Sequence, residues 1–506
     1  MRWWQRGVVY HVYPRSFQDA NGDGVGDLAG VRARLGHLRA LGVDAMWLSP
    51  FYRSPMADFG YDVADHEDVD PLFGTLADFD ALAAEARRLG IRLILDYVPN
   101  HTSIEHPWFR EHPERYLWRE RPTNWVSAFG GPAWTRDDAR GAFYYHAYLP
   151  EQPDLDWRSP DVRAAMLDVL RFWTARGADG FRIDALRQLI KDDRWRDNPP
   201  NPVWRPGENP YDELLPEFTT DRPEVAKMVA LMRAAVGDRL LIGELYLPIE
   251  RLVAYYGAGL DLPANFHLIS TPWRADALAA LVERYEAALP DGAWPNWVLG
   301  NHDRARVASR VGPAQARVAA MLLLTLRGTP TIYYGDELGL AEVPIAADEV
   351  RDPWERRVPG KGLGRDPART PMPWDDGPNA GFCAPGVAPW LPIGAENAAR
   401  NVAAQSVEPH SILSLYRRLL AVRRATPALA CGSYRTVAVE GDLLAWEREH
   451  EGERALVVLN LGSAPAVLPG TAAGRVLVAT RREREGEEIR GEVRLGPDEG
   501  VVAPLA

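Results

Sequence analysis

Short, almost uninterrupted apolar runs recur along the first four hundred residues of the chain. Runs of this kind are typical of parallel strands that are buried on both faces. Eight of them can be read from the sequence, at residues 8–13, 44–48, 91–96, 179–183, 240–244, 262–266, 297–300 and 330–334. We therefore expect eight parallel strands.

Stretches with helical periodicity separate these runs and carry recognisable end signals. Thr75 and Asp78 form a capping-box pattern before one apolar stripe, and Gly90 ends it. Pro160 opens another such stretch, which stops at Gly177. Eight strands alternating with helices predict an α/β fold, a closed (β/α)₈ TIM barrel rather than an open sheet.

Two segments depart from this repeat. About eighty residues separate the third and fourth strands, more than a crossover needs. Residues 102–160 within them are rich in Trp and Pro and predict an inserted subdomain that overhangs the catalytic face. From Thr426 onward, short alternating pieces predict a C-terminal antiparallel, β-sandwich-like domain over 426–506. The barrel would then comprise residues 1–101 and 161–425.

The composition narrows the class of protein. With 46% hydrophobic and 25% charged residues it is that of a soluble globular protein, and its apolar runs are too short to span a membrane. A net charge of −12 would repel phosphate backbones, so we expect no nucleic-acid partner. The N-terminal segment lacks the apolar core of a signal peptide, and Cys383 and Cys431 are the only cysteines. We therefore expect no disulfide framework and a cytoplasmic location.

Charged side chains follow four of the expected strands. Reactive groups of a barrel lie at the carboxyl ends of its strands. The residues at these ends are Asp96 and His101 after the third strand, Arg182 and Asp184 after the fourth, Glu244 after the fifth, and His302 and Asp303 after the seventh.

These residue types suit glycosidic bond cleavage. Arg182 and Asp184 lie two apart on one strand and therefore point to the same side, where the guanidinium favours an ionised carboxylate. A partly protonated Glu244 on another strand can donate to a leaving oxygen, which completes the equipment of a retaining glycosidase. One such carboxylate alone is more often an ordinary ion pair. Four converging strand ends of the same kind weaken that alternative.

The segments DYVPNH, GFRIDAL, GELY and NHD resemble the four signature regions of the α-amylase family of glycoside hydrolases. QPDLDW is similar to a further signature of its oligo-1,6-glucosidase and α-glucosidase branch. The resemblance implies that Asp184 is the nucleophile, Glu244 the acid/base and Asp303 the transition-state carboxylate. It also implies a glucose subsite lined by Asp62, His101, Arg182, His302 and Arg369, with Phe129 and Tyr148 flanking the scissile bond. Three residues, Asp156, His66 and Pro373, differ from those usual in the branch. These differences bear on fine substrate specificity and leave the catalytic carboxylates unchanged.

An acidic loop follows the first strand. Asp19, Asn21, Asp23 and Asp27 place oxygen atoms at the spacing of a calcium loop, but Gly30 at the twelfth position excludes an EF-hand. An Asx-rich turn is the alternative. The resemblance implies one structural Ca²⁺ bound by Asp19, Asn21, Asp23, the Val25 carbonyl and Asp27. We expect no organic cofactor.

The resemblance implies an exo-acting α-glucosidase that releases α-glucose from short α-glucosides by double displacement. Ala185, after the nucleophile, favours α-1,4 (maltose-type) linkages, because larger residues there accompany α-1,6 preference in the branch.

An oligo-1,6-glucosidase and a trehalose- or isomaltulose-forming glucosyltransferase or isomerase would share the catalytic residues. QPDLDW and the long loops disfavour an endo-acting α-amylase. The intact carboxylates and the lack of a membrane span disfavour a transporter heavy chain. The expected partner is a small oligosaccharide, and the oligomeric state stays open.

Overall fold

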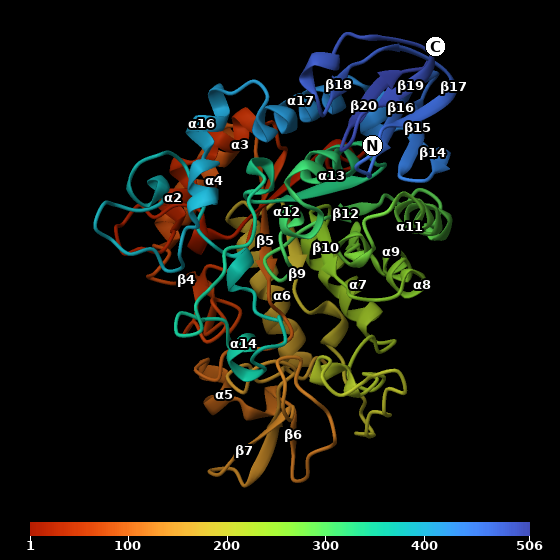
Figure 1. Ribbon diagram of the computed structural model, residues 1–506. Helices are drawn as coiled ribbons and strands as arrows, with labels where there is room; N and C mark the ends of the chain where they lie inside the picture. The colour runs from red at the N-terminus through yellow and green to blue at the C-terminus, as the bar shows by residue number, and fades with distance from the viewer. Residues whose placement is uncertain (506) are drawn as a thin grey trace.

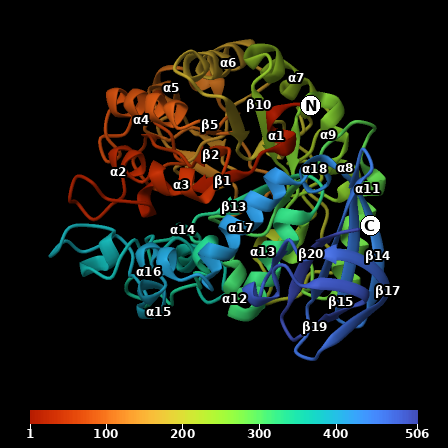
Figure 2. The same cartoon turned by 90° about the horizontal axis from the view of Figure 1, so that it is seen from above.

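The computed structural model describes residues 1–505, and its centre is a ring of eight parallel strands (Figures 1 and 2). The strands are β1 (Val9–Val12), β2 (Ala45–Leu48), β5 (Arg92–Tyr97), β9 (Gly180–Ile183), β10 (Leu240–Glu244), β11 (Leu262–Ala264), β12 (Asn296–Val298) and β13 (Thr329–Tyr333). They pair in the order β11-β10-β9-β5-β2-β1-β13-β12, and the end strands β11 and β12 touch each other. Each expected run overlaps one of these strands, so the nearly closed barrel confirms the predicted fold class.

The interior of the barrel is a packed apolar core. Alternate strand residues point inward, which is the consequence of the two-residue period of a strand. The inward residues include Val9, Ala45, Ile94, Leu240, Ile242 and Leu262, all buried. The other face of each strand packs against the surrounding helices in a larger core. Burial on both faces is why the strand sequences are almost continuously apolar.

Helices surround the strands (Figure 2). The longer ones are α3 (Leu35–Leu41), α4 (Leu76–Arg88), α6 (Pro160–Ala175), α7 (Val225–Val236), α11 (Ala275–Ala288), α13 (Pro313–Thr325) and α17 (Ile412–Ala425). Thr75 and Asp78 form the expected capping box of α4, and Pro160 is the first residue of α6. Shorter helices include α2 (Leu28–Ala33), α8 (Ile249–Leu252), α9 (Ala254–Ala258), α10 (His267–Ser270), α12 (Val307–Val311), α14 (Pro353–Arg357), α15 (Ala395–Ala399), α16 (Val402–Val407) and α18 (Pro427–Cys431).

The segment between β5 and β9 forms a separate small unit, at the bottom of Figure 1. Its strands β6 (Trp118–Arg119), β7 (Trp134–Asp137) and β8 (Ala142–Tyr145) pair antiparallel in the order β6-β8-β7, beside α5 (Pro107–Glu111). Trp125, Trp134 and Tyr145 supply an aromatic core of its own. The aromatic composition of the insertion is therefore largely explained by packing.

The C-terminal part is an antiparallel β-domain, drawn in blue in Figure 1. One sheet has the order β14-β15-β16-β20-β18, with β14 (Ser433–Glu440), β15 (Leu443–His450), β16 (Glu453–Asn460), β18 (Val478–Ala479) and β20 (Gly500–Pro504). The second pairs β17 (Ala466–Arg475) with β19 (Glu488–Leu495). Buried apolar residues of both sheets form one core between them, as in a sandwich. Within residues 1–505, every helix is too short or too polar to cross a membrane.

Candidate active site

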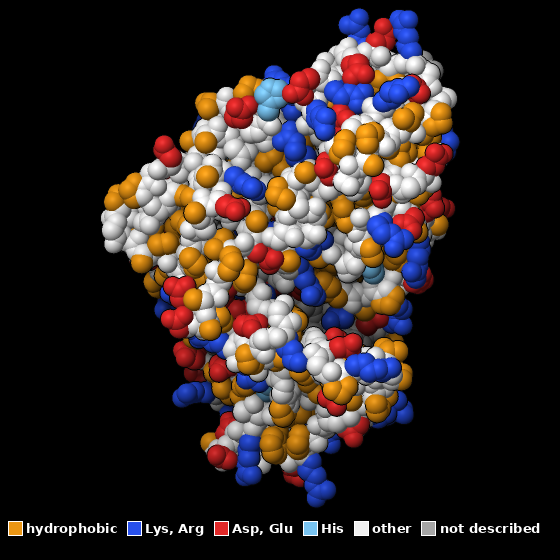
Figure 3. All heavy atoms as spheres, viewed as in Figure 1, with side chains coloured by type: hydrophobic (Ala, Val, Ile, Leu, Met, Phe, Trp, Pro, Cys, Tyr) orange, Lys and Arg blue, Asp and Glu red, His pale blue; other side chains and the backbone are white. Residues whose placement is uncertain are grey.

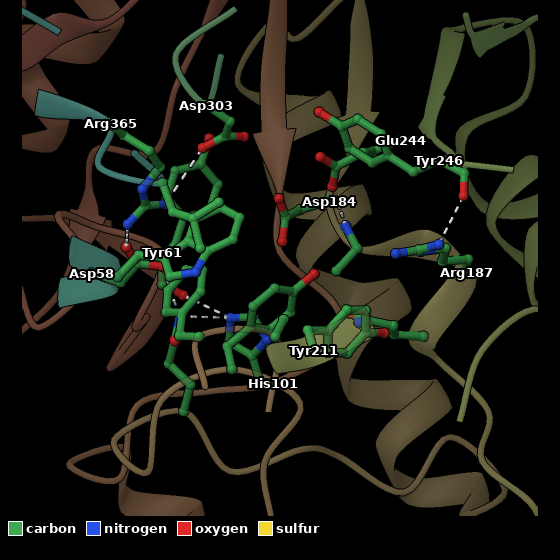
Figure 4. Close-up of a pocket in the computed structure, with 18 of the residues that line it drawn as sticks. Asp58, Tyr61, His101, Asp184, Arg187, Tyr211, Glu244, Tyr246, Asp303 and Arg365 are labelled. Carbon is green, nitrogen blue, oxygen red and sulfur yellow. Dashed lines mark hydrogen bonds and ion pairs between the residues drawn. The ribbon is translucent and has the colours of Figure 1, made fainter. Parts of the chain in front are cut away.

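A cavity of about 490 Å³ opens at the carboxyl ends of the barrel strands (Figure 4). The space-filling view shows a hollow in this face, with acidic and basic side chains interspersed around it (Figure 3). Loops after several strands and the inserted subdomain supply its walls. Seven of the residues expected in the site lie on these walls: His101, Phe129, Tyr148, Asp184, Glu244, His302 and Asp303.

Arg182 lies beneath the cavity and pairs with three carboxyl groups. Its guanidinium forms ion pairs with Asp96 at 2.8 Å, Asp184 at 2.6 Å and Glu244 at 2.8 Å. Arg182 is 2% exposed and stacks over the Trp47 ring. Asp96 and Arg182 are register partners on neighbouring strands, and Glu244 ends the next strand, β10. The parallel register thus brings three carboxyl groups from three strands to one cation.

The protonation of this cluster follows from its charge balance. Burial and the charge of Glu244 raise the pKa of Asp184 well above its ordinary value, and the pairing with Arg182 opposes this rise. Burial likewise raises the pKa of Asp96, to about 6. One guanidinium cannot balance three buried negative charges, so we infer that the cluster holds a proton near neutral pH. An acid–nucleophile pair requires one such proton, carried by the acid while the nucleophile is ionised.

Ala185 ties the ends of β9 and β10 together. Its backbone N–H donates a hydrogen bond of 2.7 Å to Oε2 of Glu244. Ala185 has a φ of +48°, in the left-handed region, and its side chain lies on the cavity wall. A residue adjacent to one carboxylate therefore helps to hold the other.

Asp303 is in the opposite electrostatic situation to Asp184. It pairs with Arg369 at 3.0 Å and with Arg365 at 3.4 Å, and His302 lies 3.5 Å away. Burial alone would raise the pKa of Asp303, but His302 and the two arginines outweigh burial and hold it below the ordinary range. Asp303 is therefore ionised at all moderate pH values.

Neutral side chains link the charged groups. The hydroxyl of Tyr61 donates to Asp96 at 3.0 Å and lies 2.7 Å from Nε2 of His302. On the other side, Gln152 hydrogen bonds to Nε2 of His101 at 3.1 Å. Gln152 opens the QPDLDW segment, so that segment contributes directly to the cavity wall.

Three of the expected residues lie behind the wall instead of on it. Both oxygens of Asp62 are used within its own loop, where they accept from Ser54 and from the backbone N–H groups of Ala57 and Asp58. Arg369 is fully buried and reaches Asp303 from below. Arg182 also lies beneath the wall, in contact with Asp184 and Glu244.

Asp58 and Arg365 take the wall positions that the sequence analysis gave to Asp62 and Arg369 (Figure 4). They form an ion pair of 2.6 Å with each other, and Arg365 also pairs with Asp352. Each lies four residues before the residue that was expected. The sequence offered one signal for these two residues. ADFGYD contains two acidic residues, Asp58 and Asp62, and GRDPAR contains two basic ones, Arg365 and Arg369, so each segment has two candidates for one wall position.

Aromatic rings and a long loop also line the cavity. Phe129 packs edge-on against Tyr148 at 5.5 Å and stacks on Trp354 at 5.2 Å. The loop after β9 adds Tyr211 to the wall, and the Lys361 ammonium donates to the carbonyl of Gly207 in the same loop. No sequence signal indicates this contribution, because the loop has no periodic pattern.

The acidic loop has a tightly hydrogen-bonded backbone. Asp19 accepts from the N–H groups of Gly22 and Gly24, and Asp27 accepts from those of Ala20, Asn21 and Gly30. Among residues 1–505, no three His, Cys, Asp or Glu side chains are grouped as metal ligands would be. The predicted donor set includes an amide and a carbonyl oxygen, so a calcium site remains a prediction.

The chain is similar in sequence to known proteins over most of its length. The sequence matches the family described as "Alpha amylase, catalytic domain" over residues 11–432. It is 41% identical to a Rhizobium meliloti protein named "Probable alpha-glucosidase", over 92% of this chain and 90% of that relative. It is 37% identical to an alpha-glucosidase of Apis mellifera, over 91% and 86% of the two chains.

Two solved structures have the same fold over the full length of both chains. An alpha-glucosyl transfer enzyme superposes with a TM-score of 0.93 at 38% sequence identity. The trehalulose synthase of Pseudomonas mesoacidophila MX-45 superposes with a TM-score of 0.91 at 31% identity. Both coverages are 100%, so the likeness includes the inserted and C-terminal units.

Proposed function

Because the chain belongs to the α-amylase family of glycoside hydrolases, we propose that it is a retaining, exo-acting α-glucosidase. It releases α-glucose from the non-reducing end of short α-glucosides, with α-1,4 linkages preferred. The names of the similar proteins from Rhizobium meliloti and Apis mellifera support this activity. The observation that carries the proposal is the convergence of Asp184 and Glu244 on Arg182 at the floor of one cavity.

The reaction proceeds by double displacement. Asp184 attacks the anomeric carbon while Glu244 passes its proton to the leaving glycosidic oxygen. Glu244 then takes a proton from water, and that water displaces Asp184 from the opposite face. Two inversions return the α-anomer. Asp303, kept ionised by its arginines, stabilises the positive charge that develops on the sugar ring.

The remaining wall residues hold the glucose. His101, His302 and the Asp58–Arg365 pair present hydrogen-bonding groups to sugar hydroxyls, while Arg182 orients the two catalytic carboxylates from below. Asp62 and Arg369 act through the residues they support. Phe129 and Tyr148 flank the scissile bond. The walls that the inserted subdomain and the loop after β9 add to the cavity support exo-action on short chains, because a long polysaccharide would need an open groove.

Product analysis tests this function directly. Proton NMR of the digest of an aryl α-glucoside, whose leaving group contributes no second glucose, should show α-glucose before mutarotation. Asp184→Asn should lower kcat by several orders of magnitude and leave the melting temperature of the protein close to that of the wild type. First release of β-glucose, or near-normal turnover by the Asn variant, would refute the mechanism.

The second candidate function is that of a glucosyltransferase or isomerase, and the names of two similar solved structures support it. One similar structure is an alpha-glucosyl transfer enzyme, and a variant of the trehalulose synthase has been solved with sucrose. The same covalent intermediate serves water or a sugar acceptor. Chromatography of reactions with sucrose, maltose and trehalose distinguishes them: dominant disaccharide products would identify the transferase, and dominant glucose the hydrolase.

For the acidic loop we propose one structural Ca²⁺, held by Asp19, Asn21, Asp23, Asp27 and the Val25 carbonyl. An all-oxygen donor set is what this cation prefers. A chelator should lower the melting temperature of the protein and added Ca²⁺ should restore it, whereas Asp23→Ala should abolish the response. A melting temperature insensitive to both additions would remove the proposal.

We also propose a cytoplasmic location. Both cysteines of the described chain are free and buried, which a reducing compartment permits. Fractionation of the source cells with an activity assay tests the proposal, and activity confined to the medium would contradict it.

A further inference from the structure

A hollow of about 800 Å³ lies where the barrel meets the C-terminal domain, and we call it the junction hollow. Its charged lining comes from α13 (Arg317), the turn before α17 (His410), the 3₁₀ helix η8 (Arg482–Arg484) and β19 (Arg494). The strand β18, which precedes η8, lies against α17 there (Figure 1). Among the described side chains, none lines both this hollow and the catalytic cavity. A molecule in the hollow would therefore touch the barrel and the C-terminal domain together.

Arginines outnumber acidic residues around the junction hollow. Five arginines border it, namely Arg317, Arg481, Arg482, Arg484 and Arg494. Three glutamates also border it, namely Glu483, Glu487 and Glu499. Figure 3 shows Lys and Arg side chains gathered on this face of the molecule, where α17 meets the C-terminal domain. Since the whole chain carries a net charge of −12, a local excess of cations runs against its overall charge.

The acidic residues of the hollow are committed to partners. Arg484 pairs with Glu487 at 2.6 Å and with Glu499 at 3.1 Å. The third glutamate, Glu483, lies 3.2 Å from Nδ1 of His410. Arg494 is paired in the same way, with a neighbouring glutamate on β19. Two of the five arginines are thus neutralised, and three are left.

Arg317, Arg481 and Arg482 have no carboxylate partner among the ion pairs of the described side chains. Their guanidinium groups donate to backbone carbonyl oxygens instead, those of Pro409, His410, Thr480 and Pro497. A guanidinium has five N–H donors, and Arg481 and Arg482 each use one of them in these contacts. Both residues are exposed, whereas Arg317 is half-buried. The hollow therefore presents uncompensated charge and unused donors.

Arg418, on α17, belongs to the same group of cations. It pairs with Glu485, but its Nε and Nη2 atoms are buried and have no hydrogen-bond partner. Burial and the charges of Arg482 and Arg317 lower the pKa of Arg418 to about 10, against the attraction of Glu483. The three guanidinium groups thus repel one another, and an anion placed beside them would relieve this repulsion.

We propose that the junction hollow binds a small phosphorylated molecule through Arg317, Arg481 and Arg482. Planar guanidinium groups match phosphate oxygens two donors at a time. A hollow of this volume is of the size that small-molecule sites have, and it exceeds a bare phosphate. The net charge of the chain disfavours a nucleic acid or an anionic membrane in the same place.

The position of the hollow implies a consequence for stability. Arg317 belongs to the barrel, whereas Arg481 and Arg482 follow β18 of the C-terminal domain. A bound phosphate would therefore hold the two parts together. Because the site exists only in the folded protein, binding should raise the melting temperature and leave turnover in the separate catalytic cavity unchanged.

Thermal melts and calorimetric titration with pyrophosphate as the probe test the proposal. Saturating pyrophosphate should raise the melting temperature by about 2 °C or more, and inorganic phosphate by less. Citrate, and sodium chloride at the same ionic strength, should shift it much less. An equal shift with citrate or chloride would show general screening of charge and would overturn the phosphate assignment.

Variants locate the effect. Arg481→Gln combined with Arg482→Gln removes two exposed guanidinium groups and should raise the Kd for pyrophosphate by about tenfold or more. Arg435→Gln combined with Arg490→Gln is the charge-matched control. Both of these arginines lie in the C-terminal domain outside the hollow, each paired with a glutamate. The control should bind as the wild type does. Equal weakening in the two double variants, or unchanged binding in the first, would refute the site.

Discussion

The backbone N–H of Ala185 donates a 2.7 Å hydrogen bond to Glu244, so the residue after the proposed nucleophile positions the proposed acid/base. The same residue adopts a left-handed backbone conformation and presents its methyl group to the cavity. Ala185 therefore both positions Glu244 through its backbone and lines the cavity. A substitution there acts on the catalytic pair as well as on the space available to substrate.

Ala185→Val should shift linkage preference. The two extra methyl groups narrow the cavity, and a β-branched residue is strained at this φ. We expect the ratio of kcat/KM for maltose to that for isomaltose to fall by about tenfold or more. Ala185→Gly, which tolerates the backbone conformation, should leave the ratio close to the wild type. A Val variant with an unchanged ratio would show that linkage is decided elsewhere.

Asp58→Asn and Asp62→Asn should have different effects although the two residues lie four apart. The Asp58 change weakens the pairing with Arg365 on the cavity wall, so kcat/KM should fall by about 10- to 100-fold, equivalent to about 1.5–3 kcal/mol. Asp62 accepts three hydrogen bonds inside its loop, two at Oδ1 and one at Oδ2, and in the Asn variant an amide nitrogen that cannot accept replaces one of these oxygens. That variant should lose about 2 kcal/mol of unfolding free energy. Steady-state kinetics and denaturant unfolding of both variants make the comparison, and the reverse pattern would restore Asp62 to the substrate site.

Asp336→Asn should flatten the dependence of stability on pH. Burial, with a contribution from Glu337, raises the pKa of Asp336 to about 7. An Asp in the unfolded chain has a pKa of about 3.9. Between these values the folded state binds more protons than the unfolded state, so the free energy of unfolding falls as pH rises. In the Asn variant this carboxyl group is absent, so this part of the decrease in unfolding free energy with rising pH disappears.

Thermal melts at pH 5 and pH 7.5 test the effect of Asp336. The melting temperature of the Asn variant, relative to wild type, should be higher at pH 7.5 than at pH 5. Asp376→Asn, at an exposed position, is the control and should show no such difference. Parallel curves for wild type and Asp336→Asn would mean that the carboxyl group titrates alike in the two states.

Arg448→Met should destabilise the contact between the barrel and the C-terminal domain. The buried guanidinium donates to the carbonyls of Thr325, Gly432 and Ser433, and Thr325 is the last residue of α13. A cation at a helix C-terminus is also favoured by the helix dipole. Its removal leaves buried carbonyls without a donor, which should cost about 2–4 kcal/mol of unfolding free energy.

Denaturant unfolding of Arg448→Met and of Arg490→Met measures this cost. Arg490 is exposed on β19 and pairs with Glu488, so its replacement should change the free energy of unfolding very little. Equal losses in the two variants would show that the buried arginine contributes no more than a surface ion pair.

Regular elements were the predictable part of this protein. Almost uninterrupted apolar runs located all eight barrel strands, and local end signals located helices such as α4, because each signal lies within a few residues of the element it marks. Asp184 and Glu244 were identifiable for the same reason: a strand that is known also determines where its carboxyl end lies. Tyr211 and Gly207 lie in a long aperiodic loop, and nothing local indicates that such a loop borders the cavity.

By itself, the sequence determined the barrel, its inserted and C-terminal units, and the carboxylates that meet at the strand ends. Tertiary structure alone decided that Asp58 and Arg365 occupy the cavity wall while Asp62 and Arg369 lie behind it. It also decided that Tyr211, from the long loop after β9, reaches the cavity wall. In a strand the backbone imposes a period that assigns each side chain to a face. In a loop the direction of a side chain depends on hydrogen bonds and ion pairs to distant segments, as between Asp58 and Arg365, which lie on different loops far apart in the chain.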